Sequence, residues 1–234
     1  MPDTEYKELF EQQKQFYMNG RLEMVKSVID QLSLKYDCDF IAINCCNSLD
    51  RDTCDVILHP EYDEDVCFTA EIKESTSDIY DRFISTLEGH RIGNQFDKEL
   101  VDNGIASKTR VLFTGDDSSL EEDVDLTPEE YIEKFSVNSL FLVTVIDKSR
   151  LDKNFGNILL EACIELSKKY KLDIVIKLYV FADGFEQCEK SLRTVPNPGD
   201  AWYKSFNPET SFGFAVINGE PSLSAENISE KCNL

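Results

Sequence analysis

The sequence has few of the residues from which metal centres and nucleic-acid-binding surfaces are usually built. It contains two histidines, His59 and His90, and although it has eight cysteines, none of them forms a C-x-x-C pair. A zinc site with the usual Cys and His spacing is therefore not predicted. Basic residues are also scarce: 24 Lys and Arg stand against 45 Asp and Glu, a formal net charge of −21. So acidic a surface repels nucleic acid and anionic membranes at long range, and attracts basic partners.

Long hydrophobic runs are missing as well. The longest, residues 140–146, is far shorter than the roughly 20 apolar residues that cross a bilayer. The first residues lack the basic start and apolar middle of a signal peptide. We therefore expect a cytoplasmic protein with reduced thiols and no membrane partner. With 41% hydrophobic and 11% aromatic residues, the 234-residue chain is expected to fold into one large or two small globular domains.

Apolar spacing in the first half predicts an α/β arrangement of two leading helices, three strands, a third helix and a fourth strand. Gly20 is expected to end the first helix as a C-cap, and Gly89 and Gly93 to kink or break the third. The predicted helices lie at residues 4–19, from residue 22, and at 77–103, and the predicted strands at 39–45, 54–59, 66–73 and 109–114. Short polar turns make the first three strands an antiparallel meander.

The second half predicts a strand–helix–strand unit that extends this mixed sheet or forms a small companion domain. Thr127, Pro128 and Glu130 match a helix start, with Thr127 as the N-cap. Strands are predicted at residues 139–147, 172–181 and 212–217, and a helix at 154–171. The expected parts are an N-terminal α/β core over 1–115, an acidic loop over 116–126, the C-terminal α/β part over 127–220 and a flexible tail over 221–234.

The hairpin of residues 54–73 has one register in which apolar side chains meet apolar side chains. Its apolar pairs are Cys54 with Ile72, Val56 with Ala70, and Leu58 with Phe68. A slip of one residue would turn every side chain to the other face, so this register is favoured. It places Asp55 directly opposite Glu71, with Lys73 two residues further along the same face.

Two like charges placed opposite each other are unfavourable unless something compensates them. Lys73 is one candidate, and a divalent cation is another. Mg²⁺ is typically held by one or two carboxylates and keeps waters that phosphate oxygens can replace. Such a cation lowers the pKa of an attacking water, and a neighbouring ammonium can orient that water. Asp55, Glu71 and Lys73 are thus candidate catalytic residues for phosphodiester hydrolysis.

This arrangement resembles the PD-(D/E)XK, or restriction-endonuclease-like, nuclease superfamily. The resemblance rests on the element order over residues 20–115, on Asp55 in the second strand, and on the triplet Glu71, Ile72 and Lys73 that closes the third. The sequence has Cys54 where the family motif places a proline before the acid.

The resemblance implies a magnesium-dependent hydrolase that acts on nucleic acid. Asp55 and Glu71 would be metal ligands, and Lys73 would lie beside the attacking water. The resemblance also implies two further candidate ligands, Glu23 from the preceding helix and the carbonyl of Ile72. The basic residues that could contact a phosphate backbone are Arg82, Arg91, Lys98, Lys108 and Arg110.

Other interpretations of the same residues remain open. Lys73 and its acidic neighbours could form only a surface salt bridge, or the fold could be a degenerate nuclease kept as a scaffold. The rival function is a non-enzymatic acidic interaction protein: an inhibitor, an immunity-type factor or a mimic of nucleic-acid charge. It would dock a basic partner through the acidic run of residues 116–125.

Overall fold

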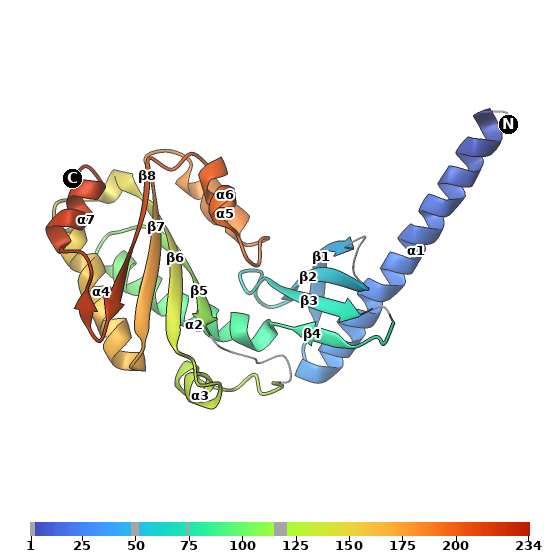
Figure 1. Cartoon of the computed structure of the whole chain (residues 1–234), viewed down its shortest axis with the longest axis horizontal. Helices are drawn as coiled ribbons and strands as arrows, with labels where there is room; N and C mark the ends of the chain where they lie inside the picture. The colour runs from blue at the N-terminus through green and yellow to red at the C-terminus, as the bar shows by residue number, and fades with distance from the viewer. Residues whose placement is uncertain (1–2, 48–51, 74, 115–120) are drawn as a thin grey trace. The chain divides into compact units, whose positions relative to one another are not determined.

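The structure, a computed structural model, describes residues 3–47, 52–73, 75–114 and 121–234. The chain forms two compact units, Met1–Asp81 and Arg82–Leu234, and each contains one sheet (Figure 1). The predicted mixed α/β class is confirmed. In the part of the chain described, no helix combines the length and the apolar character needed to cross a bilayer.

The first unit packs one helix on one antiparallel sheet. Its elements are α1 (Asp3–Tyr36), β1 (Phe40–Asn47), β2 (Thr53–Pro60), β3 (Phe68–Lys73) and β4 (Ile79–Asp81), and the strands lie in the order β1-β2-β3-β4. Val28, Leu32 and Tyr36, spaced four residues apart on α1, are buried against the sheet. The Tyr36 hydroxyl donates to Asp81 Oδ1 at 2.7 Å, which ties the end of α1 to β4.

The two leading helices expected from the sequence are one continuous helix. Gly20 lies inside α1 and does not adopt the left-handed conformation that a C-cap glycine requires. A single glycine costs a helix about 1 kcal/mol, and here no proline or second turn-forming residue follows it. The helix therefore runs on to Tyr36, and Asp37 takes the left-handed conformation after it.

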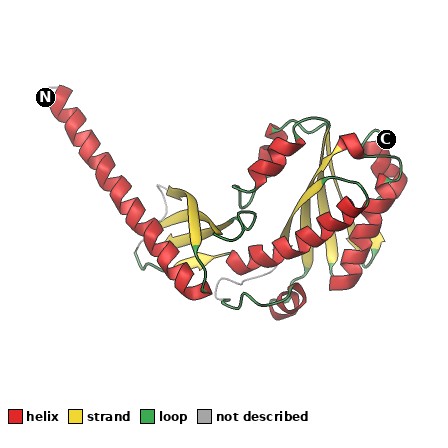
Figure 2. Ribbon diagram, turned by 180° about the vertical axis from the view of Figure 1, so that it is seen from behind, coloured by secondary structure: helices red, strands yellow, loops and turns green. Residues whose placement is uncertain are grey.

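The second unit encloses a five-stranded mixed sheet between helices (Figure 2). Its strands are β5 (Ser107–Thr114), β6 (Ser139–Asp147), β7 (Asp173–Phe181), β8 (Thr210–Ile217) and β9 (Glu220–Pro221). Its helices are α2 (Phe83–Asp102), α3 (Pro128–Lys134), the 3-10 turn Lys148–Arg150, α4 (Phe155–Tyr170), α5 (Phe185–Leu192), α6 (Asp200–Ser205) and α7 (Ala225–Lys231). The strands lie in the order of the chain, and β6 and β7 pair in parallel. Helix α4 connects them, so the predicted strand–helix–strand unit is confirmed.

Alternate residues of β6 reach opposite layers of this unit. Thr144 bonds to Thr109, whose backbone N–H and hydroxyl both donate to the buried carboxylate of Asp97 on α2. Val143 and Val145 instead face a cluster that includes residues of α5 and α6. The segment between β7 and β8, for which no helix was predicted, thus forms two helices that cover one face of the sheet.

The break considered at Gly89 and Gly93 is not present, and both glycines serve the packing of α2 on β5. A β carbon at Gly89 would lie 2.6 Å from the Val111 carbonyl oxygen, and one at Gly93 would lie 2.8 Å from the Thr109 carbonyl oxygen. Contacts that close are not tolerated by real side chains. The glycines therefore allow the backbones of α2 and β5 to approach closely, and α2 runs through both positions as one continuous helix.

The division of the chain lies at Asp81, whereas the sequence analysis placed it after residue 115. The reason is strand pairing: β5 pairs with β6 in the second sheet and does not join the three-stranded meander. The tail expected to be flexible from residue 221 contains α7, whose Ile228 is fully buried. Gly156 on α4 lets α7 approach closely, since a β carbon there would lie 2.0 Å from the Ala225 carbonyl oxygen.

Candidate functional site

The register predicted for the β2–β3 hairpin is confirmed. Asp55 pairs with Glu71, and the apolar pairs of the prediction all form. Directly opposed residues of an antiparallel pair project to the same face, with β carbons about 5 Å apart. Lys73, two residues after Glu71 and opposite Thr53, projects to that face too. The structure therefore brings the three predicted catalytic side chains onto one surface.

The two carboxylates belong to a row that crosses all four strands. Cys46 of β1 pairs with Asp55, and Tyr80 of β4 pairs with Glu71. The ring of Tyr80, whose side chain is 53% exposed, therefore stands beside the Glu71 carboxylate on the same face. The sheet therefore places four side chains in one row across its strands, those of Cys46, Asp55, Glu71 and Tyr80. The hairpin alone predicted only the two in the middle.

Burial alternates along β2 and β3, which separates the two faces of the sheet. Leu58 and Phe68 are buried, and the Phe68 ring packs on Phe40, which in turn packs on Tyr36 of α1. The opposite side of the sheet, here called the open face, is partly or fully exposed. Its residues are Ile41, Ile43, Asn44 and Cys46 on β1, Thr53, Asp55, Ile57 and His59 on β2, Thr69, Glu71 and Lys73 on β3, and Tyr80 on β4.

The charged residues of the open face are not neutralised within the described part of the chain. There, the side chains of Asp55, Glu71 and Lys73 form neither a hydrogen bond nor an ion pair with another described residue. Among the described residues, Lys73 therefore does not form the salt bridge considered in the sequence analysis. Two opposed carboxylates without a cation remain mutually repulsive.

Glu23, the third acid that the resemblance implied, does not join Asp55 and Glu71. It is an exposed residue of α1, and α1 packs on the buried face of the sheet through Tyr36. The sheet therefore lies between Glu23 and the open face. Among the described residues, no group of three or more His, Cys, Asp or Glu side chains is placed to hold a metal. Two carboxylates alone still satisfy the minimum that Mg²⁺ requires when substrate oxygens complete its shell.

The Ile72 carbonyl is not available as a ligand on this face. Ile72 pairs with Cys54 on one side and with Ile79 on the other. Carbonyl groups of a strand flanked on both sides lie in the plane of the sheet and point toward the neighbouring strands. The carbonyl is therefore directed along the sheet, while the Asp55 and Glu71 side chains stand out of it.

Three of the basic residues predicted to contact phosphate are bound within the second unit. Arg91 pairs with Glu88 at 2.5 Å and donates to the carbonyl oxygens of Leu126 and Val124 at 2.5 and 3.1 Å. Lys98 pairs with Asp102, and Arg110 donates to the Leu192 carbonyl oxygen. The described residues of the open face include two basic side chains, Lys73 and His59. These residues do not form a dense basic track around Asp55.

The acidic run of residues 116–125 is described only from Glu121 onwards, because residues 115–120 lie outside the described part. Glu121 pairs with Lys134 of α3 and accepts from the backbone N–H groups of Glu122 and Asp123. The Thr127 capping box that begins α3 is present as predicted. Part of this run is therefore engaged in the local fold, while the Glu122 and Asp125 side chains are exposed.

Glu88 of α2 is a titratable group that the sequence analysis missed. Its side chain is 0% exposed; Oε1 accepts from Arg91, and Oε2 has no hydrogen-bond partner among the described residues. Burial raises the pKa of Glu88 to about 7, against the opposing effect of Arg91 and with further raising by Glu129 and Glu130. The position of Glu88, four residues from both Ile84 and Ile92 on the buried stripe, was the available signal.

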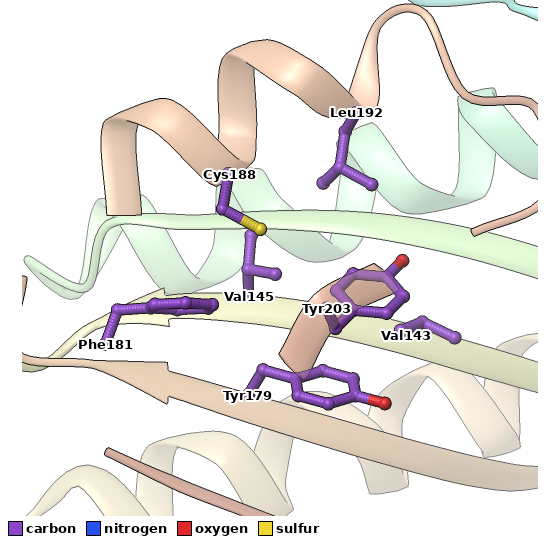
Figure 3. Close-up of a cluster of buried hydrophobic side chains, with 7 residues drawn as sticks. All are labelled: Val143, Val145, Tyr179, Phe181, Cys188, Leu192 and Tyr203. Carbon is purple, nitrogen blue, oxygen red and sulfur yellow. The ribbon is translucent and has the colours of Figure 1, made fainter. Parts of the chain in front are cut away.

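The sole tryptophan, Trp202, packs against a cluster of buried side chains of the second unit, whose buried members are drawn in Figure 3. The Tyr179 and Tyr203 rings stack with centroids 4.4 Å apart, and Trp202 lies edge-on to Tyr203 at 5.0 Å. The Tyr179 hydroxyl donates to Asp200 Oδ1 at 2.5 Å, which fixes the start of α6. The buried core of the cluster comprises Val143, Val145, Tyr179, Phe181, Cys188, Leu192 and Tyr203. Trp202 therefore covers the core of this unit.

Comparisons with known proteins show a fold and no more. No family model matches the chain, and no curated protein matches it. Among solved structures, the chain is similar to a DUF5037 family protein from Ruminococcus gnavus, determined at 2.55 Å resolution. The similarity covers 88% of this chain and 98% of that one, with a TM-score of 0.68 and 14% sequence identity. At that identity the likeness shows that the two chains share a fold.

Proposed function

We propose that this chain is a non-enzymatic interaction protein that binds a basic protein partner. The observation that carries the proposal is that basic side chains are few and that several of them pair with acidic side chains of the chain itself. Several Lys and Arg side chains of the described residues form internal pairs: Lys35 with Asp81, Arg91 with Glu88, Lys134 with Glu121, Lys148 with Glu209, and Lys169 with Glu129. Each pair uses one basic and one acidic side chain, so this pairing leaves the formal net charge of −21 unchanged while occupying cations that could bind an acidic partner.

Such a surplus of acidic charge has defined consequences for recognition. It speeds the approach of a basic protein, rejects acidic partners, and makes the association strongly dependent on ionic strength. The same surplus opposes the approach of nucleic acid, whose phosphates repel carboxylates. This sign of charge is why we rank protein binding above phosphodiester hydrolysis.

Affinity purification at increasing salt tests the proposal. The tagged full chain is used to capture proteins from a lysate of its own cells at 50, 150 and 500 mM salt, and captured proteins are then purified and titrated by calorimetry. We expect a basic protein to bind directly, with a Kd that rises at least tenfold between 50 and 500 mM salt. Direct partners that are neutral or acidic, or whose affinity is unaffected by salt, would contradict the proposal.

The pairing of Asp55 with Glu71 favours one second candidate, magnesium-dependent phosphodiester hydrolysis. In it, Asp55 and Glu71 would hold Mg²⁺ together with phosphate oxygens of the substrate, and Lys73 would orient the attacking water. The metal would supply polarisation of the phosphodiester and a lower pKa for that water.

Cleavage of DNA and RNA substrates, single-stranded and duplex, with and without Mg²⁺ tests this candidate. Asp55→Ala and Lys73→Ala should each abolish any cleavage while leaving the melting temperature nearly unchanged, because both side chains are exposed. Glu122→Gln, an exposed acid outside the sheet, is the matched control. Cleavage that survives both alanine substitutions would remove Asp55 and Lys73 from the mechanism.

A further inference from the structure

We infer that the basic partner docks on the open face of the first sheet, and that it does so with an arginine beside an apolar side chain. The inference rests on the proposed function and gives it a surface and a partner chemistry. It is carried by three features of that face: the opposed carboxylates, the tyrosine ring next to them, and a group of exposed isoleucines.

The row of Asp55, Glu71 and Tyr80 has the parts that a guanidinium group needs. The β carbons of Asp55 and Glu71 lie about 5 Å apart, and their carboxylates are bound to no other described residue. A guanidinium presents five donors in a planar fork, which can reach two carboxylates at once. The exposed Tyr80 ring on the far side of Glu71 offers a π face for a cation. An arginine bound there also relieves the repulsion between Asp55 and Glu71.

The isoleucines supply the apolar half of the same surface. Ile41 and Ile43 are 43% and 37% exposed on β1, and Ile57 of β2 lies two residues after Asp55 on the same face. Two residues along a strand span about 7 Å. The apolar group therefore begins roughly 7 Å from the carboxylate row and continues through Ile41, opposite His59.

This spacing sets what the partner must present. An arginine and an apolar side chain two residues apart on an extended segment, or four apart on a helix, are separated by roughly 6–7 Å. Aromatic and aliphatic anchors combined with an arginine are typical of protein interfaces. A lysine would bring the charge without the planar fork or the stacking, so we expect arginine to be preferred.

The test uses two peptides and the isotope-labelled full chain. Acetyl-LTRTLTR-amide, in which each arginine lies two residues from a leucine, and its lysine counterpart acetyl-LTKTLTK-amide are titrated at low salt, and backbone amide shifts are followed by NMR. We expect shifts concentrated on β1–β4, and an affinity for the arginine peptide at least threefold higher. Asp55→Asn combined with Glu71→Gln should lower that affinity about tenfold, which corresponds to about 1.4 kcal/mol. Tyr80→Leu should reduce the preference for arginine.

The matched control removes two charges elsewhere. Glu122→Gln combined with Asp125→Asn neutralises two exposed acids of the second unit and should change the affinity less than twofold. Amide spectra of each variant establish that the fold is retained. Equal losses in the two double variants, or shifts centred on residues 121–127, would overturn the open face as the docking surface.

Those results would leave the proposed function standing, because general binding of basic chains would persist. Absence of any binding by the arginine peptide would also overturn the inference. The proposed function is then decided separately, by the salt dependence of the partner obtained by affinity purification.

Discussion

Glu88 should make the stability of the second unit depend on pH in an unusual direction. Its carboxyl is 0% exposed, with Oε1 bound to Arg91 and Oε2 buried without a hydrogen-bond partner among the described residues. Glu129 and Glu130 of α3 add a further raising effect on its pKa, and Glu129 itself pairs with Lys169 of α4. The partners of a buried carboxylate lower its pKa, because they stabilise the charged form. For Glu88, burial raises the pKa by more than Arg91 lowers it.

The sign and size of the effect follow from the two pKa values. Burial raises the pKa of Glu88 from 4.5 to about 7 in the folded chain. Between these values the folded state binds more protons than the unfolded state, so stability falls as the pH rises, and levels off above pH 7. The difference between 4.5 and about 7, at about 1.4 kcal/mol for each pH unit, amounts to about 3 kcal/mol.

Glu88→Gln isolates this contribution, because glutamine keeps the shape and the acceptor for Arg91 but does not ionise. Urea unfolding of both proteins is followed by the fluorescence of Trp202, the sole tryptophan, which reports on the second unit. At pH 4.5 the two free energies of unfolding should be similar. At pH 8 the variant should be the more stable, by about 3 kcal/mol.

Other acids also titrate between pH 4.5 and 8, so the result is the difference between variant and wild type at each pH. Glu226→Gln, an exposed acid of α7, is the control and should give a curve parallel to that of the wild type. A difference for Glu88→Gln that stays constant over this pH range would refute the buried, destabilised carboxyl.

Three further substitutions test the packing. Gly89→Ala should destabilise the second unit by about 1–3 kcal/mol, because its β carbon would meet the Val111 carbonyl oxygen at 2.6 Å; Trp fluorescence in urea measures this. Gly20→Ala, with nothing within 4 Å of its added β carbon, should instead raise the helicity measured by circular dichroism and increase the free energy of unfolding of the first unit by up to about 1 kcal/mol. Tyr36→Phe should cost about 1.5–3 kcal/mol, because the buried Asp81 carboxylate loses a 2.7 Å hydrogen bond; faster amide exchange in β1–β4 would report it, and unchanged exchange would contradict it.

The site prediction succeeded where it depended on local pattern. The β2–β3 hairpin has a short connection, and its alternating apolar residues favour one register, which places Asp55 opposite Glu71; this was predicted from residues 54–73 alone. It failed for Glu23 because helical spacing places a residue on a helix but does not say which face of the sheet the helix covers. Packing of Tyr36 on Phe40 decides that, and it puts Glu23 behind the sheet.

By itself, the sequence determined the elements whose signals are contained in a few neighbouring residues. These are the strand–helix–strand unit of β6, α4 and β7, the capping box at Thr127, and the hairpin register. Each follows from side-chain periodicity or from a bond between residues three apart, so no distant part of the chain is needed to specify it.

Only the tertiary structure decided how these elements combine. Pairing of β5 with β6 divides the chain at Asp81, and the approach of α2 to β5 turns Gly89 from an expected helix breaker into a packing residue. The environment of Glu88 and the continuation of the carboxylate row to Tyr80 are also tertiary. The physical reason is common to all four: each depends on which surfaces exclude water from one another, and residues distant in sequence determine that.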